Sequence, residues 1–301
     1  MGVAPERQGQ LEQVVRMLAE DGYVARTGDT YRALTHTAED GSTLAAQLRE
    51  DHPLAASAIN LVMRCCAQLP AALRGERGRI TELLVDPARL EWDDYRTNYP
   101  AYALANLMLV GAAQQLALEQ TRQHSGNGSQ KLRILEIGAG CGALTAQVLA
   151  AMEGQIEVYH ATDAESGALD ILRERLGGNH PHLVTSVLDL KNDATAQGLA
   201  VEGFDLIIAG SGIHIASSWA ILLVRGLLRP GGHFLLVEPV RPSRLGECTW
   251  GILEDWWTLS DARQRRGYPL LNGHEWQAVL SDEGFTVALL PVVSRAVMRK
   301  A

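Results

Sequence analysis

The stretch LRILEIGAGCGALT, residues 132–145, decides the fold of this chain. An apolar run ends at Ile137, and Gly138, Gly140 and Gly142 then follow within five residues. Glycines lie this close together where a backbone must turn tightly or approach a ligand closely. A helical pattern of apolar residues begins directly afterwards. The stretch therefore predicts a buried strand, a glycine turn and a helix.

Composition excludes several classes of protein. The chain has 301 residues, 47% of them hydrophobic, and a formal net charge of −8, so it can bury one large core or two unequal ones. No long run of Lys or Arg offers the basic surface of a nucleic-acid-binding protein. The longest apolar stretch, residues 101–113, is too short to span a bilayer and contains Asn106, which favours a buried helix. With no secretory signal at the N-terminus, we expect a cytoplasmic protein with no membrane or nucleic-acid partner.

The spacing of the cysteines and histidines does not favour a metal site. The cysteines are Cys65, Cys66, Cys141 and Cys248, and none of them forms a CxxC pair. Among the nine histidines, only His180 and His182 lie close together, without an acidic or thiol partner at metal-ligand spacing. We therefore expect a protein without a metal.

The pattern of apolar residues changes at residues 124–131, a small, polar, glycine-bearing segment that predicts a linker. The part before it is mainly helical, with a short hairpin over 22–34. Strands and helices alternate after it, and a strand pair is expected over 284–300. The predicted internal strands are continuous apolar runs over 133–137, 156–161, 183–188, 204–209 and 233–238. Such runs indicate an α/β fold with a doubly wound, mainly parallel sheet.

Two classes of cofactor use such a glycine turn. Gly138-x-Gly140-x-x-Ala143 satisfies the dinucleotide pattern, in which a pyrophosphate lies at the helix N-terminus. Glu136, however, stands just before the first glycine, where its carboxylate would repel a pyrophosphate. S-adenosylmethionine (SAM) instead offers an ammonium group and a sulfonium centre, which favours SAM over NAD.

Two further acids support that choice. Asp163 follows the second predicted strand, where it is placed to accept hydrogen bonds from ribose hydroxyls. Asp189 follows the third, where it is placed to accept one from an adenine amino group. A glycine turn that merely packs a helix on a strand would not need three acids at consecutive strand ends.

At these residues the sequence resembles the SAM-dependent methyltransferase domains of polyketide synthase and nonribosomal peptide synthetase assembly lines, particularly the carbon-methylating type. The blocks that carry the resemblance are LRILEIGAGCGALT, YHATDAES, LDLKNDATAQG, FDLIIAGSGIHIA, LLRPGGHFLLVEP, WGILEDWWTL and HEWQAVLSDEGF. The resemblance implies SAM as cofactor, with S-adenosylhomocysteine (SAH) as product, and a carrier-bound thioester substrate. We expect a mainly helical lid or substrate subdomain over 1–125 and a SAM-binding core over 126–301 with an insertion over 242–272.

The expected site residues follow the strand ends and the parts that would enclose them. We expect the cofactor to contact Glu136, Gly138, Ala139, Gly140, Asp163, Ala164, Asp189, Leu190 and Gly210. We expect the substrate channel and its lid to contain Tyr95, Tyr99, Asn106, Trp250 and Trp257, although most of the tryptophans of such a chain pack in its core.

Two residues are predicted to be catalytic. His214 lies just beyond the strand over 204–209, and Glu238 ends the strand over 233–238, so the two should approach each other. The resemblance implies the same pair. A neutral imidazole, with an ordinary pKa of about 6.5, can remove a proton from the acidic carbon between a thioester and a ketone. Glu238 would orient the ring and stabilise its protonated form. Alternatively, His214 only caps a helix or contacts the substrate, and Glu238 pairs with Arg241 or Arg244.

The sequence leaves several functions open. The first is methyl transfer to the α-carbon of a carrier-tethered acyl or β-ketoacyl thioester. The second is O-methylation of a hydroxylated natural product, because the same histidine can deprotonate a hydroxyl. The third is a catalytically silent SAM-binding module, and a nicotinamide-dependent oxidoreductase is a distant fourth.

Overall fold

The computed structural model describes most of the chain. The described residues are 2–28, 30–34, 40–76, 88–123, 131–210, 213, 218–253, 256, 268–290 and 295–300. The predicted linker over 124–131 lies, except for Lys131, outside them. The chain forms two compact units, the first made of Met1–Tyr99, Pro242–Leu259 and Arg266–Pro269, and the second of Pro100–Arg241, Ser260–Arg265 and Leu270–Ala301.

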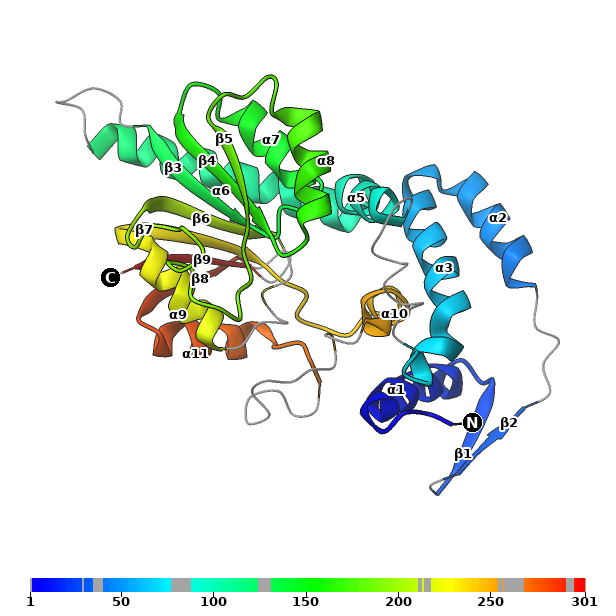
Figure 1. Ribbon diagram of the computed structural model, residues 1–301. Helices are drawn as coiled ribbons and strands as arrows, with labels where there is room; N and C mark the ends of the chain where they lie inside the picture. The colour runs from blue at the N-terminus through cyan, green and yellow to red at the C-terminus, as the bar shows by residue number, and fades with distance from the viewer. Residues whose placement is uncertain are drawn as a thin grey trace. The chain divides into compact units, whose positions relative to one another are not determined.

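The second unit is built on a seven-stranded sheet (Figure 1). Its strands are β3 (Leu132–Ile137), β4 (Ile156–Asp163), β5 (Leu183–Val187), β6 (Phe204–Gly210), β7 (Leu228–Val237), β8 (Phe285–Leu290) and β9 (Arg295–Lys300). In the sheet they follow the order β5-β4-β3-β6-β7-β9-β8. The strands from β5 to β7 are parallel, and β9 runs antiparallel to both β7 and β8. The predicted mainly parallel sheet and its terminal strand pair are therefore confirmed.

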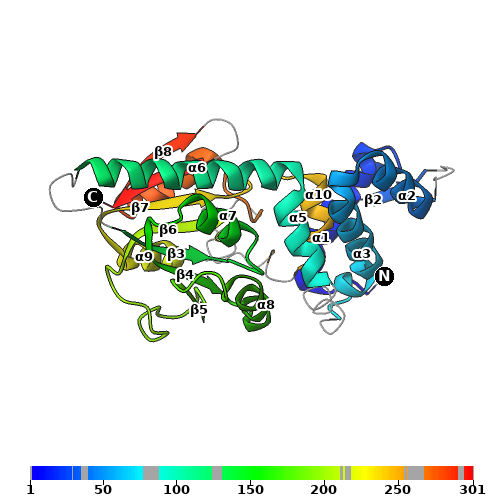
Figure 2. The same ribbon diagram turned by 90° about the horizontal axis from the view of Figure 1, so that it is seen from above.

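Helices cover both faces of this sheet (Figures 1 and 2). The helices of this unit are α6 (Pro100–Gln123), α7 (Ala143–Ala151), α8 (Ser166–Leu176), α9 (Ser218–Leu227) and α11 (Gly273–Asp282). Successive side chains of a strand point to opposite faces, so Ile134 packs in one buried cluster and Leu135 in another. The cluster around Ile134 includes residues of α6, α7 and α8, whereas the one around Leu135 includes residues of α9 and α11. The continuous apolar runs of the strands follow from this burial on both faces.

The order of the strands places a possible ligand site. The chain winds outward from β3 through β4 to β5 and then returns to β6 on the other side of β3. Ligands of doubly wound sheets bind outside the carboxyl ends of the strands at such a switch point. The register aligns Ile137 with Thr162 and with Ala209, so the ends of β3, β4 and β6 lie at the same edge.

Helix α6 packs against the sheet of the second unit. The sequence instead predicted that the helical subdomain would extend to residue 125 and would include this helix. Ala105, Leu109 and Ala113 are buried in the same cluster as Ile134 of β3. The two compact units accordingly separate between Tyr99 and Pro100. The polar residues 124–131 follow the end of α6, so their composition does not indicate that the units separate before this helix.

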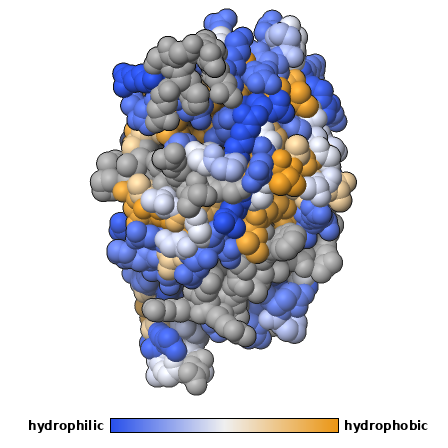
Figure 3. Space-filling view, turned by 90° about the vertical axis from the view of Figure 1, so that its left-hand side faces the viewer, coloured by the Kyte–Doolittle hydropathy of each residue, from blue (hydrophilic) through white to orange (hydrophobic). Residues whose placement is uncertain are grey.

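Two helices of the described residues are long and apolar enough to cross a membrane by length and composition, over Pro53–Leu73 and Pro100–Gln120. Residues 101–113 form part of a longer helix, which begins at Pro100 and continues to Gln123. Buried side chains occupy 33% of the second span, and core helices pass the same test. Leu107 and Leu118 of this helix are exposed, and the face of the molecule in Figure 3 likewise shows hydrophobic side chains between hydrophilic ones.

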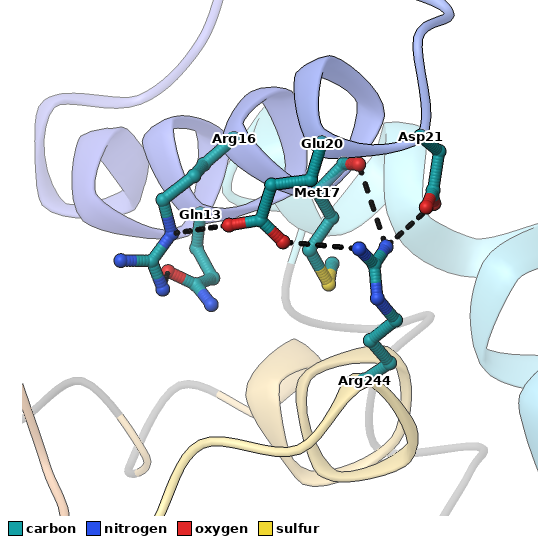
Figure 4. A network of polar contacts seen from close by, with 6 residues as sticks. All are labelled: Gln13, Arg16, Met17, Glu20, Asp21 and Arg244. Carbon is teal, nitrogen blue, oxygen red and sulfur yellow. Dashed lines mark hydrogen bonds and ion pairs between the residues drawn. The ribbon is translucent and has the colours of Figure 1, made fainter.

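The first unit is mainly helical. Its main elements are α1 (Gln8–Glu20), β1 (Val24–Thr27), β2 (Thr30–Ala33), α2 (Gly41–Asp51), α3 (Ala56–Leu73), α5 (Ala88–Asn98), α10 (Arg244–Cys248) and the 3₁₀ turns η1 (Pro5–Arg7), η2 (Pro53–Ala55) and η5 (Trp250–Ile252). The strands β1 and β2 pair antiparallel, as predicted for the hairpin. Arg244 of α10 forms ion pairs with Glu20 and Asp21 at the end of α1 (Figure 4). These ion pairs attach α10, which follows β7 in the sequence, to the end of α1.

Candidate active site

The glycine turn joins β3 to α7 and is fastened to the end of β4. The φ angles of Gly138, Gly140 and Gly142 are +74°, +57° and +95°, in the left-handed region that favours glycine. The N–H groups of Gly138 and Ala139 both donate to the carbonyl of Thr162, at 2.9 Å each. Gly142 stands at the N-terminus of α7. The turn therefore has a fixed backbone shape, as the sequence predicted.

We expect Gly142→Ala to lower the free energy of unfolding by about 1–3 kcal/mol, because a side chain at this φ is strained. A Cβ atom would also lie 3.1 Å from atoms of Leu172 and Leu176 on α8. Gly154→Ala is the matched control, since Gly154 has a φ of +76° but no atom within 4 Å of such a Cβ. Denaturant unfolding of both variants checks this. Equal losses of stability would contradict the packing part of the argument.

Asp163 closes the turn from β4. Its Oδ2 accepts the N–H of Gly140 and its Oδ1 accepts the N–H of Glu165, at 2.9 Å each. The side chain is half-buried, so its carboxylate is not sealed in the core. A carboxylate held in this way can also accept hydrogen bonds from vicinal hydroxyls, because each of its oxygens has two lone pairs.

The prediction that Asp163 binds the ribose of SAM implies that Asp163→Ala raises the dissociation constant for SAM about 100-fold, because this variant removes a charged acceptor that also fixes two backbone donors of the turn. Asp170→Ala is the control, since the Asp170 side chain on α8 is 68% exposed and pairs with Arg173 on the same helix. Isothermal titration calorimetry measures both constants. An unchanged affinity in Asp163→Ala would remove Asp163 from the cofactor site.

Glu136 lies beneath the turn and faces the interior. It is 1% exposed, and its Oε2 accepts hydrogen bonds from the hydroxyls of Thr145 at 2.6 Å and Tyr159 at 2.7 Å. The sequence suggested a carboxylate that meets the methyl donor's positive charge. The structure instead places the Glu136 carboxylate among side chains of the core.

The other predicted cofactor residues lie along the same edge. Asp189 follows β5, and its carboxylate accepts hydrogen bonds from the N–H of Lys191 and the side chain of Asn192. Leu190 is half-buried against the cluster of Leu135, and Ala164 is exposed directly after β4. Gly210 ends β6, where a Cβ would lie 3.2 Å from Leu144 of α7. Glycine at 210 thus allows α7 to pack closely against the end of β6.

Glu238 directly follows β7 and is 2% exposed. Its Oε1 accepts the backbone N–H of Ile213 at 2.6 Å, so it holds this residue after the end of β6. His214, the next residue, lies outside the described residues. One alternative for Glu238 was an ion pair with Arg244, but the guanidinium of Arg244 pairs with Glu20 and Asp21 (Figure 4).

The predicted lid residues fall into different units. Tyr95 is buried on α5, with its ring centroid 6.2 Å from that of Trp92 and 5.2 Å from that of Tyr99. Trp250 lies 4.1 Å from Trp92, ring centroid to centroid, so these aromatic residues form one cluster of the first unit. Asn106 is buried on α6 in the second unit. Trp257 lies outside the described residues.

Several residues that shape the turn were not predicted from the sequence. Arg175 of α8 donates to the carbonyl of Cys141 at 2.8 Å, although it lies 34 residues away in sequence. Thr145 and Tyr159 hold the Glu136 carboxylate. Thr145 could have been noticed as a hydroxyl in the first turn of the helix, but nothing in the local sequence marks Arg175.

Within the part of the chain that the structure describes, no group of three or more His, Cys, Asp or Glu side chains is arranged to hold a metal ion.

Comparison with known proteins identifies the domain. Residues 135–234 match a family model described as a methyltransferase domain, and these residues run from β3 to β7. The chain carries a methyltransferase domain. Its methyl donor is S-adenosylmethionine, and one structural relative, the trans-methyltransferase CalH, was solved with SAH (TM-score 0.76, 21% identity).

The methyltransferase domain also matches solved structures over its whole length. The CurJ carbon methyltransferase aligns with 100% of this chain and 82% of its own, with a TM-score of 0.86 and 27% identity. The DszA carbon methyltransferase aligns with 99% of this chain and 80% of its own, with a TM-score of 0.83 and 24% identity, which shows the shared fold.

The curated relatives are much longer proteins. Fumosorinone synthetase from Cordyceps fumosorosea is 32% identical over 224 residues, which are 73% of this chain and 5% of that protein. Polyketide synthase ThaG from Burkholderia thailandensis is 30% identical over 275 residues, which are 81% of this chain and 5% of that protein. The methyltransferase domain thus corresponds to a small part of each.

Proposed function

We propose that the domain transfers a methyl group from SAM to the α-carbon of a β-ketoacyl thioester carried on an acyl carrier protein, in polyketide or mixed polyketide–peptide biosynthesis. Similarity to CurJ, described as a carbon methyltransferase, and to the synthases above supports this class of acceptor. We also propose that the protein is cytoplasmic and that its mainly helical first unit acts as a lid.

The chemistry of the strand ends fits the cofactor. A half-buried carboxylate at Asp163 suits the hydroxyls of a ribose, and Asp189 suits an adenine amino group. The buried charge of Glu136 favours a cationic ligand over a pyrophosphate beside the same turn. Bound SAM supplies a methyl group already activated by its sulfonium, so the protein must mainly align and deprotonate the acceptor.

The observation that carries the catalytic assignment is the hydrogen bond from the N–H of Ile213 to the buried carboxylate of Glu238. It ties Glu238, the residue after β7, to Ile213, which precedes His214 in the sequence. In the proposed reaction His214 removes the α-proton, and the nearby negative charge of Glu238 stabilises the imidazolium that forms. The acceptor carbon is then the nucleophile.

A substrate panel tests this proposal. The domain is incubated with SAM and pantetheine-linked β-ketoacyl, simple acyl and β-hydroxyacyl thioesters, and the products are analysed by mass spectrometry. We expect turnover of the β-ketoacyl thioesters above all others, because their α-carbon is the most acidic. Methylation of only the hydroxylated compounds would support an O-methyltransferase instead. SAM binding without any turnover across the panel would support a silent cofactor-binding module.

A further inference from the structure

The hydroxyls around Glu136 form a small, fully buried arrangement. Glu136 lies on β3, Thr145 in the first turns of α7, and Tyr159 on β4. All three side chains are at most 1% exposed. The hydroxyls of Thr145 and Tyr159 donate to the same carboxylate oxygen, Oε2, at 2.6 and 2.7 Å. Side chains of β3, β4 and α7 therefore meet at one carboxylate oxygen of Glu136.

Both hydroxyls are suited to a permanent donor role. Burial, together with the neighbouring Glu136, raises the pKa of Tyr159 well above its usual value, so the phenol keeps its proton. A threonine hydroxyl does not ionise in this range. Hydrogen bonds from neutral donors to a carboxylate are short and strong, and they lower the cost of burying its charge.

Glu136 and Thr145 flank the glycine turn in the sequence. Glu136 stands two residues before Gly138, and Thr145 stands three residues after Gly142. A further hydroxyl, that of Thr162 on β4, donates to the backbone carbonyl of Glu136 at 2.7 Å. The carbonyl of the same Thr162 accepts the N–H groups of Gly138 and Ala139. The strand before the turn, the helix after it and the neighbouring strand are thus joined through Glu136.

We propose that Thr145 and Tyr159 are positioning residues for the methyl donor: their hydroxyls hold the Glu136 carboxylate charged and fixed beneath the glycine turn, which pre-organises the turn for a cationic ligand. Neither residue touches the cofactor in this proposal. Each acts through Glu136, which stabilises both the shape of the turn and the positive charge bound above it. The inference deepens the proposed function at its cofactor site and depends on SAM binding, not on the nature of the acceptor.

The test measures the dissociation constant for SAM by isothermal titration calorimetry in the apoprotein. Tyr159→Phe removes only the phenolic oxygen, and we expect the constant to rise about tenfold, the scale on which loss of a residue that orients a binding group weakens affinity. Thr145→Val should have an effect of similar size, while Thr145→Ser, which keeps a hydroxyl, should retain most of the affinity. Ser186→Ala is the control, because it removes a hydroxyl that bonds His160 of β4 at 2.7 Å and should leave SAM binding unchanged.

A double-mutant cycle separates action through Glu136 from a general loss of structure. If Tyr159 acts through the carboxylate, Tyr159→Phe should weaken SAM binding in the wild-type background but have little further effect in Glu136→Gln. Additive effects would overturn the proposal, and so would an unchanged SAM constant accompanied by a lower unfolding temperature. Should Tyr159→Phe fail to fold, the same cycle with Thr145→Val decides between these outcomes.

The outcome of the double-mutant cycle does not depend on which acceptor the domain methylates. If the wild-type domain binds SAM but methylates no β-ketoacyl thioester, the proposed function fails while the cycle still reports on Glu136. If methylation proceeds and the cycle is additive, the proposed function stands and the positioning role is wrong.

Discussion

Replacing His214 with alanine is expected to slow methyl transfer to a β-ketoacyl thioester by about 10²–10⁴-fold, the usual contribution of a positioned general base. The dissociation constant for SAM should stay near the wild-type value, because the imidazole is assigned to the acceptor and not to the cofactor. Single-turnover kinetics and calorimetry measure the two quantities separately.

His180→Ala is the matched control for this variant. His180 precedes β5, at the amino end of that parallel strand and so at the opposite edge of the sheet from the candidate site, and its loss should leave the rate unchanged. A His214→Ala rate close to that of the wild type would contradict the assignment of the base. A large loss of SAM affinity would instead indicate that His214 supports the cofactor.

Glu238→Ala is expected to lower the rate about 100-fold, because it leaves the N–H of Ile213 without its acceptor at a position that excludes water. The segment that carries His214 would then lose its attachment to β7. Glu238→Gln keeps an oxygen acceptor but removes the charge, so it separates the two effects. We expect an intermediate loss of about tenfold if both orientation and charge contribute.

Steady-state rates at saturating SAM measure both Glu238 variants, with circular dichroism to confirm that they fold. A rate in Glu238→Gln equal to that of the wild type would mean that the carboxylate only holds the backbone. A rate in Glu238→Ala equal to that of the wild type would remove Glu238 from the mechanism altogether.

The sequence predicts the sheet well because of how its strands are buried. Runs such as RILEI and FDLIIA carry apolar residues at consecutive positions because helices cover both faces, whereas a strand with one face in solvent alternates apolar and polar residues. The extent of α6 was harder to predict. Its packing against the sheet depends on Ala105, Leu109 and Ala113, small or aliphatic residues that suit either a lid or a core.

The candidate site was predicted in outline but not in orientation. The glycine turn and Asp163 have local signals, whereas the inward direction of Glu136 depends on the alternation of side chains along β3, which puts it on the same face as Ile134. Tyr159 pairs with Ile134 in the sheet register and therefore lies beside that carboxylate. Arg175 reaches the turn from α8, and only the packing of the whole unit brings it there.

The most direct measurement of the central claim is the position of the transferred methyl group. The domain is incubated with SAM labelled with carbon-13 in its methyl group and a β-ketoacyl pantetheine thioester, and the product is examined by NMR. The account predicts a labelled methyl carbon whose protons correlate with the α-proton and the α-carbon of the thioester. A labelled methyl bound to oxygen, or label that stays in SAM while the wild-type domain binds it, would contradict the account.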